Sequence, residues 1–393
     1  NFTFSSSVSG YSLYGFATAA SSNTRTYSTV AALATSNATT VYAILYKSVT
    51  GTFYYNSNTT SGSFTAASTT ASANQYIRCT SSAAETSNSN YTIPTAVTGS
   101  VGKYNAAYVG VATAASTMTS STTAGTANTT FYAVYRSALT IYYPNSSSGV
   151  SNSATALYRN EYFTSTSAMS TITSTGTTST TQATTVTLSS IKGTFGGLAT
   201  AVNTTTKYAV NNSTIINSNT TTYYAVTTAS VTGTYWYNSN TTSGSLTATS
   251  TTASATNTYY CTSTSAMTTS YGSITIPTAV TGSVGKYNSA YAGLASALSS
   301  MAKATDVAGT SLTASVTTMK LAADTTYYAV YSTGVTIYYP SSATARGTYS
   351  YYRNEYFTST SAMTPVIATS ATGTSNFTFS SSVSGYSLYG FAT

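Results

Sequence analysis

The chain carries few residues that do chemistry, and their types exclude several enzyme classes. It has no histidine, which removes Ser-His-Asp and Cys-His catalysis and the commonest metal ligand. Its carboxylates, none close in sequence to another, are Glu85, Glu161, Asp306, Asp324 and Glu355. A glycosidase needs two facing carboxylates, whereas Glu161 and Glu355 occupy equivalent places in separate repeats. We expect no enzyme activity, no cofactor and no metal site.

The densest charges lie in Arg159-Asn160-Glu161, which returns as Arg353-Asn354-Glu355. A structural ion pair is one interpretation, although exposed pairs contribute only about 0–1 kcal/mol. The alternative is an intramolecular Lys–Asn amide bond promoted by a buried glutamate, with Lys103, Lys192 or Lys286 as the donor. The candidate ion-pair or amide-bond groups are Lys103, Lys286, Glu161 and Glu355.

Cys79 and Cys261 stand at matching places in two repeats, where Phe163 and Phe357 stand in two others. A position that accepts Cys or Phe is most simply buried and apolar. A disulfide would require the two Cα atoms to lie within about 7 Å, which a linear array of repeats disfavours. We therefore expect both cysteines to be core residues.

The 38 tyrosines often occur in adjacent pairs, such as Tyr54-Tyr55 and Tyr142-Tyr143. Adjacent residues of a strand point to opposite faces, so each pair offers one ring to the core and one to the outside. The outer rings suit stacking on a sugar or packing on another module, and packing is favoured. Trp236, the only tryptophan, replaces Tyr54 at the matching position, and these two are the candidate glycan or packing contacts.

The composition predicts a neutral, β-rich protein. Only 5% of residues are charged, against about 25% in an ordinary soluble domain. The net charge of +8 is scattered without a basic run, so we expect no nucleic-acid partner. No stretch of 18 apolar residues occurs, so we expect no membrane span. The abundant Thr and Tyr residues favour strands over disorder.

Repeated words divide the chain into modules. The segment NFTFSSSVSGYSLYGFAT occupies residues 1–18 and again 376–393, as in one period of a repeating sequence. The segment VTGTFYYNSNTTSGS, which begins at Val49, recurs as VTGTYWYNSNTTSGS from Val231. A Tyr-Ala-apolar word and a Gly-apolar-Ala word each recur four times. These spacings predict a unit of roughly 90–100 residues.

Each module is predicted to open with an alternating strand such as 49–55 and to close with a strand at the Tyr-Ala-apolar word. Helical evidence is thin: residues 290–302, small and apolar throughout, predict a short helix or a turn. The predicted modules are 46–136, 137–229 and 230–331. Residues 1–45 are the late part of a module and 332–393 the early part, each completed by an adjoining repeat or a neighbouring chain.

In these words the modules resemble the Listeria–Bacteroides repeat, which is related to the internalin B-repeat of bacterial surface proteins. Val49-Thr50, Pro94, the 108–110 segment and the strand 130–135 match parts of its pattern in order, and 230–331 repeats the match. The family's tryptophan is replaced, for example by Val111 and Leu294. The resemblance implies an elongated, mainly β array of β-grasp-like modules in a spacer or adhesive stalk.

We therefore expect a structural repeat protein that forms an extracellular filament or cell-surface stalk by head-to-tail continuity of its modules. Its main partner would be itself, as repeats or as subunits of a homopolymer. The alternative is an adhesin or glycan-binding surface protein, whose partners would be glycans or a host or cell surface. Both hypotheses place the protein outside the cell.

Overall fold

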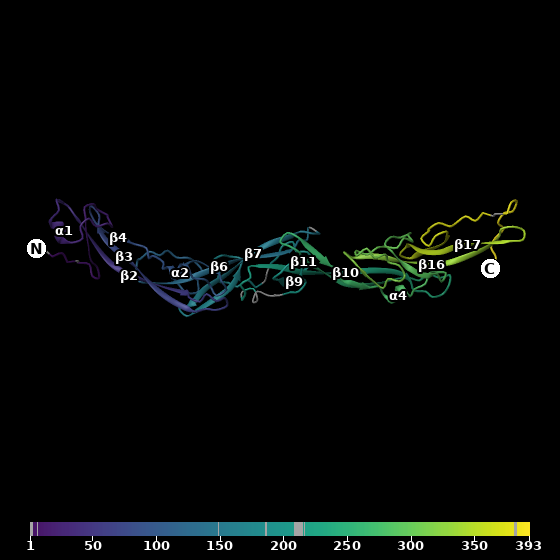
Figure 1. The fold of residues 1–393 in the computed structure, drawn as a ribbon, viewed down its shortest axis with the longest axis horizontal. Coiled ribbons are helices and arrows are strands. Elements are labelled where there is room, and N and C mark those ends of the chain that lie inside the picture. The colour runs from purple at the N-terminus through teal and green to yellow at the C-terminus, as the bar shows by residue number, and fades with distance from the viewer. Residues whose placement is uncertain are drawn as a thin grey trace.

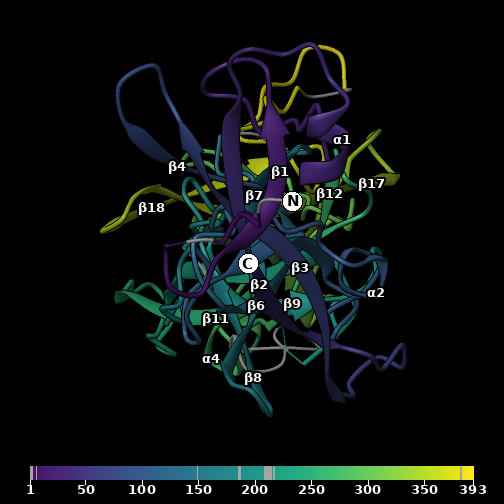
Figure 2. The ribbon, with the colours of Figure 1, turned by 90° about the vertical axis from the view of Figure 1, so that its left-hand side faces the viewer.

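The protein is an elongated, mainly β molecule. The computed structural model describes residues 3–5, 7–147, 149–184, 187–207, 215, 217–380 and 383–393. Strands make up 49% of the structure and helices 4%, which confirms the expectation of a mainly β fold. The N- and C-terminal ends lie at opposite ends of the long axis (Figure 1). Seen along that axis, β1 (Ser12–Ala17) and α1 (Val30–Ala34) lie at the near, N-terminal end (Figure 2).

The remaining elements follow one another along the molecule. The first half holds β2 (Tyr42–Asn56), β3 (Ala66–Cys79), β4 (Ala84–Asn88), α2 (Thr95–Thr98), β5 (Ala107–Ala112), β6 (Thr129–Pro144), β7 (Asn152–Ser165), β8 (Ala168–Ser174) and β9 (Thr194–Ala199). The second half holds β10 (Thr222–Asn238), β11 (Ala248–Cys261), β12 (Met267–Ser270), β13 (Ser273–Thr275), α4 (Thr278–Thr281), β14 (Ala290–Ala295), β15 (Thr318–Lys320), β16 (Thr325–Pro340), β17 (Arg346–Ser359) and β18 (Ala362–Ala368).

Four long strands, β2, β6, β10 and β16, form the backbone of one large mixed sheet. Each overlaps the next in a short parallel ladder: 51–54 with 129–132, 140–142 with 222–224, and 233–236 with 325–328. Between ladders, each long strand is flanked by antiparallel strands, such as β5 and β7 beside β6. The sheet therefore continues along the molecule because the end of each long strand pairs with the start of the next.

The predicted module boundaries fall inside these long strands. The boundary after residue 45 lies within β2, and those after 136, 229 and 331 lie within β6, β10 and β16. The closing strand of one predicted module and the opening strand of the next are thus one continuous strand. Residues 44–49 include no Gly, Pro or Asn to interrupt it.

Of the helix or turn predicted over 290–302, the helix is wrong, and residues 298–299 form a turn. Residues Ala290–Ala295 form β14, which pairs antiparallel with β16. Leu294 is fully buried there in an apolar cluster that includes Ala329 of β16. Small residues fit beside a crowded strand as well as they fit a helix, so tertiary packing decided the conformation.

The Gly-apolar-Ala word has a structural cause. Its glycines, Gly15, Gly110, Gly197 and Gly293, have φ values of 150°, 153°, 148° and 135°, which side chains rarely tolerate. Each lies at a register shift in the ladder to the neighbouring long strand. The word therefore encodes a β-bulge in which glycine is required.

Substituting one of these glycines is expected to destabilise the fold. A Cβ atom on Gly293 would lie 2.2 Å from the carbonyl oxygen of Leu312, and the backbone strain alone costs about 1–3 kcal/mol. We expect Gly293→Ala to lower the melting temperature, measured by calorimetry. The control is Gly334→Ala in β16, where a Cβ meets nothing within 4 Å. Equal melting temperatures for the two variants would contradict the bulge explanation.

The core is divided into clusters along the sheet. The larger ones surround Tyr235 and Tyr327, Phe53 and Phe131, and Ile141 and Tyr223. Phe163, Cys261 and Phe357 are at most 2% exposed, and Cys79 is half-buried at the matching position. Both cysteines are free thiols, as expected for residues of an apolar position.

Candidate functional site

The candidate functional sites are the junctions, by which we mean the parallel ladders and the groups packed on them. Aromatic rings stack across all three ladders. The rings of Phe53 and Phe131 lie 4.7 Å apart at an interplanar angle of 11°, and both side chains are at most 1% exposed. Tyr142 and Tyr224 stack at 5.8 Å, and Tyr235 and Tyr327 at 5.9 Å. Paired strands bring matching positions together, so a repeated sequence stacks like on like.

A buried tyrosine hydroxyl ties each of two long strands to the next. The backbone N–H of Asn56, at the end of β2, donates to the hydroxyl of Tyr135 on β6 at 2.9 Å. The same bond joins Asn238 to Tyr331 at 2.9 Å. Burial raises the pKa of both hydroxyls to about 12, so they remain protonated. They act as fixed hydrogen-bonding groups and not as acids.

Glu161 is the most perturbed carboxylate. It is fully buried on β7, where its two oxygens accept the backbone N–H of Tyr104 at 3.1 and 3.3 Å. Burial raises the pKa of Glu161 to about 7, opposed by that N–H and by Arg159. Glu355 is likewise fully buried and accepts the N–H of Tyr287 at 3.2 and 3.1 Å. Each glutamate thus binds the loop after a short helix, α2 or α4. The contact links that loop to the later hairpin that carries the glutamate.

Arg159, on the same face of β7 as Glu161, binds a later segment of the chain. Its side chain is fully buried, and Nη2 donates to the carbonyl oxygens of Ile215 and Thr220 at 2.9 and 3.0 Å. Burial lowers the pKa of this guanidinium. Arg159 and Glu161 do not form a salt bridge; among the described residues the one salt bridge joins Arg78 to Glu85. The Arg-Asn-Glu word therefore connects β7 to one segment before it and one segment after it.

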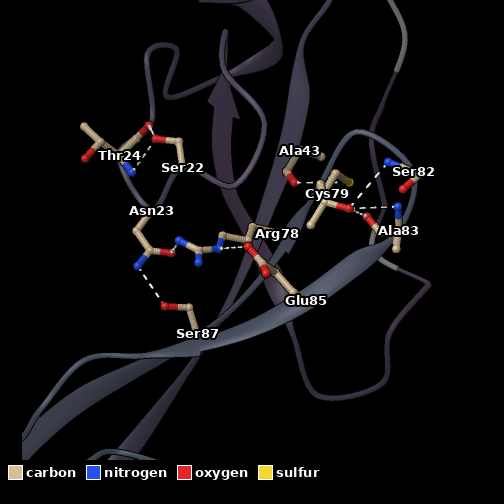
Figure 3. A network of polar contacts seen from close by, with 11 residues as sticks. Ser22, Asn23, Thr24, Ala43, Arg78, Cys79, Ser82, Ala83, Glu85 and Ser87 are labelled. Carbon is tan, nitrogen blue, oxygen red and sulfur yellow. Dashed lines mark hydrogen bonds and ion pairs between the residues drawn. The ribbon is translucent and has the colours of Figure 1, made fainter.

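The other carboxylates also serve structure. Arg78 Nε donates to Glu85 at 2.7 Å, and Arg78 Nη1 donates to Asn23 at 3.0 Å (Figure 3). Asp306 accepts the backbone N–H groups of Ala308, Thr310 and Lys320. Asp324 accepts that of Thr232 at 2.8 Å. Every carboxylate of the chain thus contacts a structural donor, and no two of them face each other across a pocket.

Each candidate lysine directly precedes the tyrosine whose backbone N–H binds a buried glutamate. Lys103 precedes Tyr104, whose N–H binds Glu161, and its ammonium lies 5.4 Å from the centre of the Tyr104 ring. Lys286 is placed in the same way, 5.5 Å from the Tyr287 ring. Both ammonium groups therefore rest on an aromatic face. An amide bond from either lysine stays a prediction.

The candidate glycan residues pack against the core. Tyr54 stacks on Tyr132 at 5.7 Å and borders the cluster around Phe53. Trp236 is half-buried and borders the cluster around Tyr235. Each lies in a parallel ladder, opposite Tyr132 and Tyr328 respectively. The geometry supports packing as their role.

Sequence reasoning missed the residues that fasten the junctions. These are the asparagine and tyrosine of each hydroxyl link and the backbone amides that bind the glutamates. The recurrence of Asn56 as Asn238, and of Tyr135 as Tyr331, was the available signal. The partners are separated by 79 and 93 residues, so no local pattern could pair them.

Comparisons with known proteins add no relationship: no family model, curated protein or solved structure matches the chain. The class of protein is therefore defined by the fold alone, an extended mixed β-sheet with buried junctions. Among the residues that the structure describes, no helix is long and apolar enough to pass through a membrane. Within the same residues, no three metal-binding side chains gather into a cluster.

Proposed function

We propose that this chain is a structural repeat protein that builds an extracellular filament or cell-surface stalk. One observation carries the proposal: three parallel ladders join the four long strands in series, and β6 and β10 each run from one ladder into the next, so one sheet continues along the molecule. Such a sheet suits a load-bearing spacer, and the neutral, Thr- and Ser-rich surface suits an exposed position.

The proposal includes tandem modules of about 90–100 residues with a β-grasp-like core. Its support is the arrangement of 46–136, where β2 and β6 run parallel at the centre and β3 and β5 flank them antiparallel. The short helix α2 contributes the buried Val97 to the same cluster. The region 230–331 repeats this order with β10, β11, β14 and β16.

The test is to locate the protein on intact cells that produce it. Gold-labelled antibodies against the chain should decorate an external filament or stalk in electron micrographs, at regular intervals along it. The mass of the dissociated chain then distinguishes a homopolymer from one long polypeptide. Labelling only after permeabilisation would overturn the proposal.

The adhesin alternative makes a separate prediction at Trp236. Because this ring packs on the core cluster around Tyr235, we expect Trp236→Ala to lower the melting temperature. A glycan array should give the same binding profile for the variant and the parent chain. A loss of sugar binding with an unchanged melting temperature would favour the adhesin instead.

A further inference from the structure

A hollow near the C-terminal end gathers polar residues from distant parts of the chain. Ser243, Tyr287 and Arg353 line this hollow of about 520 Å³ together with part of β18. Ser243 is exposed, Tyr287 is 39% exposed and Arg353 is half-buried. These three hydrogen-bonding side chains, with that of Asn376, thus converge on a space open to solvent.

The repeated sequence contains a second copy of this trio whose hollow is filled. The counterparts are Ser61, Tyr104 and Arg159, in the words NTTSGS, GKYN and RNEYFTSTSAM. All three bind the segment 215–220, which lies immediately before β10. The contacts run from Ser61 Oγ to Asn219 Oδ1, from Tyr104 Oη to Asn217 Oδ1 at 2.8 Å, and from Arg159 Nη2 to the carbonyls of Ile215 and Thr220.

The segment that fills the inner hollow also has a counterpart. Ser218-Asn219, Thr221-Thr222 and Tyr224-Ala225 correspond to Ser36-Asn37, Thr39-Thr40 and Tyr42-Ala43, so 33–38 matches 215–220. This segment begins with the last two residues of α1 and lies at the N-terminal end of the molecule (Figure 1). Asn37 is exposed there, and Leu33 is half-buried where Ile215 is fully buried.

The neighbouring sheet edge shows the same relation. At the inner junction, 140–142 pairs in parallel with 222–224, and Ile141 is fully buried. The corresponding stretch of β16, 336–338, has no parallel partner strand among the described residues. Here Tyr338 is 60% exposed and Ile337 is only half-buried. A ladder that is complete inside the chain is therefore half-built at its C-terminal end.

We propose that residues 33–42 of a second copy of this chain fill this hollow and add a parallel strand to 336–338. Asn37 of the second copy would meet Ser243, and its Leu33 and Ala38 carbonyls would accept from Arg353. Its Tyr42 would stack on Tyr338. The two surfaces lie at opposite ends of one molecule (Figure 1), so the contact joins different copies head to tail and does not close. This inference rests on the proposed function and specifies its interface.

The duplicated segment is compatible with this contact. In one copy, Ser12–Ala17 forms β1 beside the start of β2, and Phe16 is 3% exposed. The same six residues at 387–392 form no strand, and Phe391 is 60% exposed. A docking copy brings β1 already paired with its own β2, so residues 387–392 of the first copy are not required at that edge.

Disulfide trapping tests the contact. In a Cys79→Ala background, Asn37→Cys with Ser243→Cys should give a ladder of covalent multimers on a non-reducing gel. The control with known geometry is Ser61→Cys with Asn219→Cys, whose side chains are in contact within one chain and which should cross-link inside the monomer. Asn37→Cys with Ser315→Cys, an exposed site elsewhere, should give no ladder. The interface is overturned if the first pair fails while the internal pair forms, or if the mismatched pair gives an equal ladder.

A pair of substitutions distinguishes assembly through this interface from assembly by any other contact. Arg353→Ala removes two predicted charge-assisted hydrogen bonds, so sedimentation velocity should show association at least about tenfold weaker, with an unchanged melting temperature. Arg159→Ala should instead lower the melting temperature and leave association unchanged. Assembly unaffected by Arg353→Ala and without trapping at Asn37 would leave the proposed function standing and overturn the interface. No association of the parent chain at any concentration would overturn the interface and leave standing a stalk made of one long polypeptide.

Discussion

Replacing Phe53 by alanine is expected to cost about 3–5 kcal/mol of unfolding free energy. The ring is fully buried, stacks on Phe131 and contacts Tyr91 edge-on. It lies at the first parallel ladder. The cavity left by the substitution would therefore lie where β2 pairs with β6. A calorimetric scan should show the transition of this region shifted to lower temperature. Regions far from the ladder should melt as before, because distant sites act independently.

Tyr54→Ala is the matched control for this substitution. Tyr54 is the next residue of the same strand and also stacks on its partner, Tyr132, but it is only half-buried. The cost of removing it should therefore be clearly smaller. If Phe53→Ala and Tyr54→Ala shift the transition equally, the buried stack is not what holds the junction.

The second large effect is a loss of stability between about pH 4.5 and pH 7. Burial raises the pKa of Glu161 from 4.5 to about 7 in the folded state. Between these values the folded protein keeps the proton and the unfolded chain has lost it. The unfolded state then binds fewer protons, so stability falls as the pH rises and levels off above 7. The change is on the order of 3 kcal/mol.

The chain has no histidine, and the Asp306 pKa lies below its ordinary value, held down by backbone N–H groups against the opposing effect of burial. Urea unfolding between pH 4 and pH 8 measures the slope. Glu161→Gln keeps an oxygen for the Tyr104 N–H, removes the titration and should flatten the profile. Glu85→Gln, at a partly exposed salt bridge, should keep the slope. A parent chain that gains stability from pH 4.5 to pH 7 would contradict the assignment.

The mainly β fold and the positions of many strands could be predicted because their signals are local. The alternating residues of 49–55 and the Tyr-Ala-apolar words lie in the long strands where they were expected. The sequence also held the evidence that β2 is continuous, since no turn residue separates its two halves. The boundary predicted after residue 45 separates a closing strand from an opening strand, and both are parts of the one strand β2.

The junction contacts could not be predicted, because they depend on where distant backbones meet. Glu161 binds the N–H of Tyr104, 57 residues away, and nothing in the Arg-Asn-Glu word identifies a backbone amide as its partner. The helix, one of the two alternatives predicted at 290–302, failed for a related reason. Small residues there allow both a helix and a strand, and pairing with β16 stabilises the strand.

The lengthwise course of the long strands has a mechanical consequence. Hydrogen bonds of a parallel ladder are evenly spaced and run across the strands at a slant, and β2, β6, β10 and β16 run along the long axis (Figure 1). Tension along that axis would load all the rungs of each ladder together in shear, instead of opening them one at a time. Between ladders, the pull passes through a single covalent backbone. Each ladder would therefore resist stretching by shear of several hydrogen bonds at once.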